Sequence, residues 1–225
     1  MNWSEFEAHC AKHRPRFWWR DDDAGAVTPQ LKKLLSLSKD VALALAVIPE
    51  AAESALFDLL HENVTVIQHG TDHRNRAAPG EKKTEYPASE PNERALARIA
   101  QGQERLRRMG GKRFFPVLAP PWNRLRKDLA DELPAIGVRG VSGYRAAGAG
   151  HTQVDVVAWR RGKRFIGKQQ AFEAALSGTE PVGWLTHHAV HDEETWQFLE
   201  RLLGLNTVRW LSVQEVFSYT AAAHG

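Results

Sequence analysis

Three consecutive aspartates and a spaced pair of histidines are the residues of this chain whose types and spacing suggest chemistry. Asp21, Asp22 and Asp23 stand side by side. Adjacent carboxylates repel one another, and a bound cation relieves that repulsion. An exposed acidic turn that opens a helix has the same composition, so both interpretations stay open. His69 and His73 are four residues apart, and on one turn of helix both imidazoles would face the same way and could share a metal.

Two imidazoles and one carboxylate would form a metal site with positions left open for water and substrate. The spacing His-x-x-x-His is a weak signal alone, because a chain with ten histidines produces it easily. A divalent cation in such a site lowers the pKa of bound water to roughly 7 and polarises a carbonyl or phosphoryl oxygen. The combination therefore predicts a hydrolase with one divalent metal ion. Zinc suits these ligands best, and iron, cobalt, nickel and manganese also fit them.

The elements that must position these residues alternate along the chain. Apolar and β-branched runs predict strands at residues 17–20, 41–48, 64–67, 114–119, 138–142, 154–159, 182–186 and 208–211. Apolar residues at helical spacing predict helices near residues 29–35, 51–60, 96–109 and 193–203, and a last helix after residue 212. Three helix starts carry capping signals, at Thr28, Asp192 and Ser212. The polar stretch 74–91 has no periodicity and is predicted to be a loop.

Strands separated by helices imply a parallel sheet, either a barrel or a doubly wound sheet. Four of the predicted strands lead into unusual polar segments, at residues 21–23, 68–69, 120–123 and 187–188. Because the carboxyl ends of parallel strands host active sites, these segments are expected to meet. No Pro- or Ser-rich linker and no internal repeat divides the sequence, so we expect residues 1–225 to form a single domain.

Composition excludes several classes of protein. With 225 residues, 43% hydrophobic and 25% charged, the chain is neither disordered nor collagen-like. No apolar run approaches the roughly 18 residues of a membrane span, and Cys10, the single cysteine, cannot form an internal disulfide. No signal peptide is visible, so a cytoplasmic protein is expected. The net charge is only +3, and neither basic run (105–113 and 160–164) interleaves aromatic residues, so no nucleic-acid partner is expected.

Taken together, the motifs resemble the polysaccharide deacetylase family. The resemblance rests on aspartates after the first strand, His-x-x-x-His after the third, the Pro-Pro-Trp turn at 120–122 and the Leu-Thr-His segment at 185–187. Their order and spacing fit from Phe17 to about Trp210. The resemblance implies an α/β fold, a distorted (β/α) barrel of about seven mostly parallel strands. It also implies a metal-dependent hydrolase that removes an acyl group, typically acetyl, from an amino sugar, an oligosaccharide or a related amide.

The resemblance also implies roles for individual residues. It makes Asp22 the catalytic base and His187 the general acid, and it makes Asp23, His69 and His73 the metal ligands. A shift by one residue, with Asp21 and Asp22 as the working pair, stays open.

Four further residues are candidates for substrate binding: Trp122, Asn123, Arg124 and Asn75. Trp122 could stack on a sugar ring or pack within its turn. Asn75 could bond a ligand or support the loop that contains it. His188 is expected to point away from His187 and to have a structural role.

Three positions depart from the family pattern. Ala119 stands where the family has an arginine before its prolines, and Arg20 and Arg124 are the candidates to supply that charge. Ala158 stands where the family has the aspartate that orients the histidine, and Asp155 is the candidate to compensate. Gly70 replaces a small hydroxyl residue. These departures keep an alternative open, in which the chain is a non-catalytic relative that binds a metal or a carbohydrate.

Overall fold

The computed structural model describes residues 1–145 and 150–222. Its strands are β1 (Arg16–Ala24), β2 (Leu43–Val47), β3 (Val64–His69), β4 (Phe114–Ala119), β5 (Gly140–Val141), β6 (Val154–Asp155), β7 (Val157–Ala158), β8 (Arg164–Phe165), β9 (Val182–Thr186) and β10 (Arg209–Leu211). Its helices are α1 (Trp3–His13), α2 (Pro29–Leu37), α3 (Ser54–Asp58), α4 (Asn92–Gly110), α5 (Lys127–Glu132), α6 (Lys168–Ser177), α7 (Glu193–Leu203) and α8 (Val213–Ala222). Short 3₁₀ turns include η1 (Pro49–Ala51), η3 (Pro121–Asn123), η5 (Trp159–Arg161) and η6 (His188–Val190).

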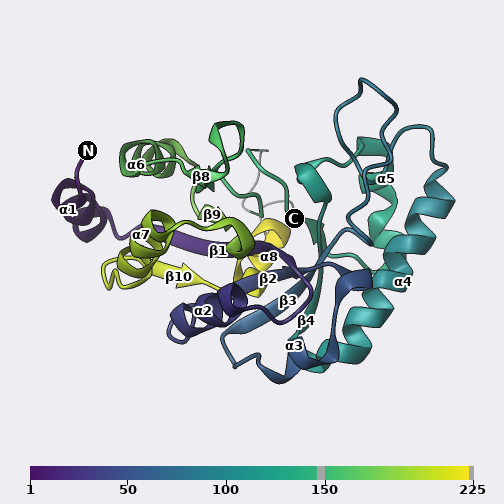
Figure 1. Ribbon diagram of the computed structural model, residues 1–225, viewed down its shortest axis with the longest axis horizontal. Helices are drawn as coiled ribbons and strands as arrows, with labels where there is room; N and C mark the ends of the chain where they lie inside the picture. The colour runs from purple at the N-terminus through teal and green to yellow at the C-terminus, as the bar shows by residue number, and fades with distance from the viewer. Residues whose placement is uncertain (146–149, 223–225) are drawn as a thin grey trace.

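Eight strands form one curled sheet in the order β5-β4-β3-β2-β1-β9-β6, with β10 beside the start of β1. Every pairing in this sheet is parallel, while β7 and β8 form a separate antiparallel pair. A bridge between Tyr144 and Thr152 links the segments next to the two edge strands. Figure 1 shows the sheet curling through the middle of the molecule, with helices around its outside. The predicted distorted (β/α) barrel is confirmed over the doubly wound alternative.

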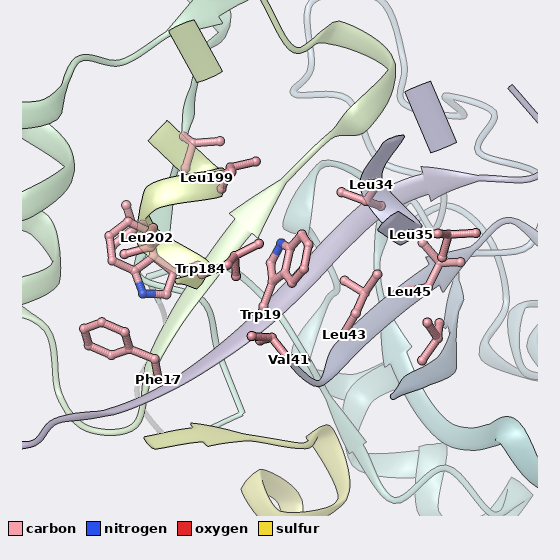
Figure 2. Close-up of a cluster of buried hydrophobic side chains, with 14 of the residues drawn as sticks. Phe17, Trp19, Leu34, Leu35, Val41, Leu43, Leu45, Trp184, Leu199 and Leu202 are labelled. Carbon is pink, nitrogen blue, oxygen red and sulfur yellow. The ribbon is translucent and has the colours of Figure 1, made fainter. Parts of the chain in front are cut away.

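The central strands β1, β2, β3 and β9 are buried on both faces, because helices cover the outer face and the curled sheet encloses the inner one. Figure 2 shows outward side chains of three strands packed against two helices: Phe17 and Trp19 of β1, Leu43 and Leu45 of β2, Trp184 of β9, Leu34 and Leu35 of α2, and Leu199 and Leu202 of α7. The inner face carries smaller residues such as Ala44, Ala46 and Ala119, packed against Trp18. Side chains from facing strands meet inside a narrow barrel, which leaves room for few large ones.

The predicted helix starts are confirmed in their capping contacts. The side chains of Thr28 and Asp192 accept the backbone N–H groups of Leu31 and Thr195, and Ser212 forms a capping box with Glu215. Helices α1, α5 and α6 were not predicted. In α1 and α6 few large side chains are buried, and in α6 two of the three are alanines, so their apolar stripes are weak.

Several predicted segments differ from the structure. In place of the predicted helix at 51–60 stand the turn η1 and the five-residue α3, and only β5 forms within the predicted strand at 138–142. The predicted strand at 154–159 is split into β6 and β7, because the N–H of Val156 bonds to Leu185 of β9 before the chain turns away. His69 and His73 do not share a helical turn: His69 ends β3, and a tight turn carries His73. Residues 74–91 contain neither helix nor strand, as predicted. Within the described ranges, every helix is too short or too polar to cross a membrane.

Candidate metal centre

The end of β1 places two consecutive aspartates on the same side of the sheet. A regular strand directs neighbouring side chains to opposite faces. Here the register with β2 shifts between Asp21 and Ala24, and Asp23 has φ of 68°, in the left-handed region. Such a bulge redirects a side chain at the edge of a barrel. Asp22 and Asp23 therefore both face the histidines that follow the other strands.

Asp23, His69 and His73 converge on one point. Oδ1 of Asp23 lies 3.1 Å from Nε2 of His69 and 3.3 Å from Nε2 of His73. One nitrogen or oxygen atom from each of the three residues lies within 4.8 Å of the other two. Asp23 and His73 are partly exposed, so the cluster is open to solvent on one side. Two imidazoles and a carboxylate with an open side fit a divalent cation that keeps positions for other ligands.

The surroundings of His69 fix which of its nitrogens faces the cluster. Nδ1 donates to the carbonyl oxygen of Ala119 at 2.9 Å, so Nε2 is directed at Asp23. Metal-binding histidines commonly hold their second nitrogen in this way. Burial lowers the pKa of His69, but the carboxylates of Asp22 and Asp23 outweigh burial and raise it. Burial likewise opposes ionisation of Asp23, yet the hydrogen bond from His69 holds the pKa of Asp23 well below its usual range. The cluster thus favours a positive charge at its centre.

His73 reaches the cluster from a turn with unusual backbone geometry. Gly70 has φ of 58° and His73 has φ of 56°, both in the left-handed region. The N–H of Gly70 donates to the carbonyl oxygen of Ala119, which ties the turn to β4. Burial and the charge of His69 lower the pKa of His73, which favours the neutral imidazole that ligates a metal.

Asp22 lies next to this cluster and is paired with a buried arginine. Nε of Arg20 lies 2.9 Å from Oδ1 of Asp22, and Nη2 donates to Oδ2 at 3.0 Å. The guanidinium also donates to the side chains of Ser142 and Asn123 at 2.7 Å each. Both partners of the ion pair are buried, so the pair is held in one geometry. Arg20 therefore places a positive charge beside Asp22, whereas Arg124 is exposed and donates to the carbonyl oxygen of Lys83.

His187 follows β9 and lies between two carboxylates. Its Nε2 is 3.8 Å from Oδ2 of Asp22, and its Nδ1 is 3.9 Å from Oδ1 of Asp155. Asp155 is fixed by two donors, the backbone N–H of Val157 and the indole of Trp159. The ring of Trp159 meets that of His187 edge to face, with centroids 4.6 Å apart. Asp155 is thus the carboxylate that lies beside Nδ1 of His187.

Asp21 points to a different set of partners. Its carboxylate accepts hydrogen bonds from the hydroxyl of Thr186 and from the backbone N–H of His188, and it contacts Nδ1 of His188 at 2.5 Å. Burial disfavours this charge, but His188 outweighs burial and lowers the pKa of Asp21. The structure therefore groups Asp22 and Asp23, rather than Asp21 and Asp22, with the three histidines, and it gives His188 a structural contact.

The candidate substrate-binding residues divide into two groups. Trp122 and Asn123 lie at the cluster: the ring of Trp122 is 4.6 Å from that of His73, and Asn123 accepts from Arg20. Both have φ near 55° in the turn η3. Arg124 is turned toward Lys83, and Asn75 accepts the N–H groups of Ala77 and Thr84, which supports the loop.

Sequence reasoning did not assign a site role to Trp159, although it lies against His187. The signal was its position four residues after Asp155, which lets the indole bond back to that carboxylate.

The sequence matches no family model and no curated protein. The fold does match solved structures. One is a T48 deacetylase with substrate, at 15% identity and a TM-score of 0.62 over 94% of each chain. Another is a family 4 acetyl xylan esterase from Clostridium thermocellum in complex with a cobalt ion, at 13% identity and a TM-score of 0.60 over 91% of this chain and 90% of that one. A third is BA3943 from Bacillus anthracis, a CE4 family pseudoenzyme, at 13% identity and a TM-score of 0.57 over 91% of this chain and 65% of that one.

These matches establish the fold: the chain is built like the family 4 carbohydrate esterases and their deacetylase relatives. The resemblance expected from the motifs is borne out at this level. The neighbours include both active enzymes and a pseudoenzyme, so the fold alone does not determine activity.

Proposed function

We propose that this chain is a metal-dependent deacylase that hydrolyses the N-acyl amide, typically N-acetyl, of an amino sugar or a related small amide. The observation that carries the proposal is one arrangement of five side chains. The donors of Asp23, His69 and His73 lie within 4.8 Å of one another, and Asp22 and His187 flank them. A cation site with one carboxylate and one imidazole beside it has the groups that amide hydrolysis needs.

Asp23, His69 and His73 would hold one divalent cation. The cation, when bound, would lower the pKa of water and polarise the acyl oxygen of the substrate. The donor set fits zinc first, and cobalt, iron, nickel and manganese as alternatives. The N–H of His69 that bonds to Ala119 would hold the imidazole in the orientation for ligation.

Asp22 is the general base in this proposal. Its carboxylate accepts a proton from water as the water oxygen forms a bond to the carbonyl carbon. The contact with Arg20 fixes the direction of the carboxylate. Because Asp22 is buried, it has little freedom to turn away from the reacting atoms.

His187 is the general acid. The C–N bond breaks as the imidazole donates a proton to the departing amine, and Asp22 carries the proton taken from water. The products are one carboxylic acid and one amine, so one water is consumed for each amide cleaved. The carboxylate of Asp155 lies 3.9 Å from Nδ1, so a second acidic group stands beside the imidazole.

The positions of two indole rings favour a substrate that contains a sugar ring. Trp122 lies against His73, and Trp159 lies against His187 with 43% of its surface exposed. An exposed indole such as that of Trp159 beside a polar site suits stacking on a sugar ring, and the indole of Trp122 is partly exposed. The carboxamide of Asn123 adds a polar group at the same place.

A second candidate function is a non-catalytic protein that binds a metal or a carbohydrate. It is favoured by the alanines at 119 and 158, and a pseudoenzyme stands among the structural neighbours. Against it, Arg20 and Asp155 supply the two charges that those alanines lack.

The first test is the metal content of the purified chain. The protein is stripped with a chelator, loaded with zinc, cobalt or manganese, and analysed by mass spectrometry beside His69→Ala. We expect about one cation per chain in the wild type and its loss in the variant. His13→Ala is the matched control, because His9 and His13 form a second imidazole pair on α1, with ring centroids 4.3 Å apart.

The second test is release of acetate from N-acetylglucosamine and its oligomers by the loaded protein. A chain that binds the cation but releases no acetate from any acylated amino sugar or small amide would favour the non-catalytic alternative. A wild type that retains no cation would contradict the proposed ligand set.

A further inference from the structure

Glu85 is a fully buried carboxylate in the loop between β3 and α4, and the mechanism above does not use it. Its Oε1 accepts the backbone N–H of Thr71 at 2.9 Å and that of Asp72 at 3.1 Å. These two amides immediately precede His73. One carboxylate oxygen therefore holds the part of the turn from which the imidazole projects.

The same carboxylate fills the space beside Gly70. A Cβ atom at Gly70 would lie 2.1 Å from Oε2 of Glu85 and 2.5 Å from Cγ of Pro121. The turn 70–73 is thus enclosed between the loop on one side and η3 on the other. Glycine is required at position 70, both for this close approach and for its φ of 58°.

Two arginines make a buried carboxylate possible at this place. Nη1 of Arg98 donates to Oε1 of Glu85 at 3.3 Å, and Nη1 of Arg76 lies 3.9 Å from the same oxygen. Arg76 also donates to both oxygens of Asp72, inside the turn. A buried charge without such partners would cost several kcal/mol.

A neighbouring hydrogen bond ties the loop to the same turn. The hydroxyl groups of Tyr86 and Thr71 lie 3.0 Å apart, and the guanidinium of Arg98 stands over the ring of Tyr86. Glu85 and Tyr86 therefore connect the base of the loop to the turn at three points: two backbone amides and one hydroxyl.

We propose that Glu85 is a positioning residue of the metal centre, whose carboxylate fixes the 70–73 turn so that His73 faces Asp23 and His69 before any cation binds. The inference rests on the proposed metal site. Its consequence is that cation binding needs little ordering of the chain, because the ligand with the least regular backbone is already held. Outer contacts of this kind change metal affinity by about 10- to 100-fold.

The experiment titrates zinc or cobalt into the chelator-stripped full chain and into three variants. Glu85→Ala removes the acceptor and is expected to weaken cation binding by about 10- to 100-fold. Glu85→Gln keeps an oxygen acceptor for both amides and is expected to restore most of the affinity. Glu90→Ala is the matched control: Glu90 accepts from Arg98 in the same network but has no hydrogen bond to the turn, so wild-type affinity is expected.

The visible spectrum of bound cobalt separates positioning from general loss of stability. Glu85→Ala is expected to alter the band shape, which reports the ligand geometry, whereas Glu85→Gln keeps it. Equal affinity and equal spectra in the wild type and Glu85→Ala would overturn this inference alone. A wild type that binds neither cation would overturn the metal site and this inference together.

Hydrogen exchange of the metal-free wild type gives a test that needs no variant. The amides of Thr71 and Asp72 are expected to exchange slowly before any cation is added, because both are bonded to Glu85. Exchange at the rate of an unprotected loop, with protection gained only on adding zinc, would overturn the proposal. This result stands even if Glu85→Ala fails to fold.

Discussion

Arg20 and Asp22 form a buried ion pair within a single strand, with Nε of the guanidinium 2.9 Å from Oδ1 of the carboxylate. Residues two apart in a strand point to the same face, so the pair needs no contribution from another strand. Trp18, two residues earlier, belongs to the inner cluster of the barrel, as does Ala119 of β4. The positive charge beside the proposed base therefore comes from β1, although Ala119 faces the same interior.

This relationship predicts that an arginine at position 119 can partly replace Arg20. Arg20→Ala leaves the Asp22 carboxylate buried without its partner, which costs about 3–5 kcal/mol of folding free energy. We expect acetate release to fall with it, and Ala119→Arg in the same chain to restore part of both. Unfolding curves and kcat/KM measure the two effects. Arg107→Ala, at an exposed pair with Glu104, is the control. If Arg20→Ala/Ala119→Arg regained neither stability nor activity, a positive charge beside Asp22 would not be sufficient to explain the effect of Arg20.

Asp22→Asn separates catalysis from metal binding. The amide oxygen still accepts from Arg20, and Asp23, His69 and His73 are untouched, so metal content is expected to stay at about one cation per chain. Because an amide cannot take a proton from water, kcat is expected to fall by about 10² to 10⁴. Mass spectrometry and acetate release on one preparation give both values. Full activity in this variant would exclude Asp22 as the base.

Asp155→Asn tests the carboxylate beside His187. The change keeps a similar shape and one oxygen acceptor, so it retains the bond from Val157 or from Trp159 but not both, and it removes the negative charge 3.9 Å from Nδ1. We expect kcat to fall by about 10- to 100-fold, with KM and metal content unchanged, because proton donation is weakened and substrate contacts are not. A rise in KM at constant kcat would instead assign Asp155 to substrate binding.

Asp192 tests the fold independently of the site. Its carboxylate caps α7 through Thr195 and also accepts the N–H of Phe165 in β8. Asp192→Ala is expected to cost about 2 kcal/mol at pH 7, from the lost cap and the second hydrogen bond. Urea unfolding of the metal-free protein measures this cost, and a loss below about 0.5 kcal/mol would contradict it.

The charge of Asp192 gives this contribution a pH dependence. Burial raises the pKa of Asp192, but the bonds from Thr195 and Phe165 outweigh it and lower the pKa. The contribution is therefore present above the unfolded value of about 3.9 and is lost as pH falls through the lower folded value. Asp192→Asn keeps the cap without the charge. The stability difference between wild type and Asp192→Asn is expected to shrink as the pH falls below the unfolded value of about 3.9.

The barrel could be predicted because each strand is marked locally, by apolar runs such as that of β2 and by polar residues after β1, β3, β4 and β9. The lengths of the later strands could not, because β5 and β6 are two residues long and depend on their neighbours. Helix α6 is defined by packing of Ala171, Phe172 and Ala175 against the core, which the spacing of alanines does not indicate.

For the site, the sequence supplied the five central residues, since motifs record which side chains follow which strand. The residues that hold these five in place could not be predicted from the sequence. Arg20 reaches Asp22, Ser142 and Asn123, and Glu85 reaches the turn at 70–73, only after distant segments come together. The helical turn proposed for the histidine pair was wrong because spacing alone does not distinguish a helix from a strand end followed by a turn.

The arginine on β1 also has a consequence for recognising related chains. Because Arg20 and Asp22 are joined through one strand, a substitution at position 119 removes nothing from the pair. A chain with Arg two residues before the aspartate pair therefore keeps this charge when a small residue stands before the two prolines. A search pattern that requires arginine directly before the two prolines would miss such a chain. One that reads Arg-x-Asp-Asp together with Ala-Pro-Pro would include this chain.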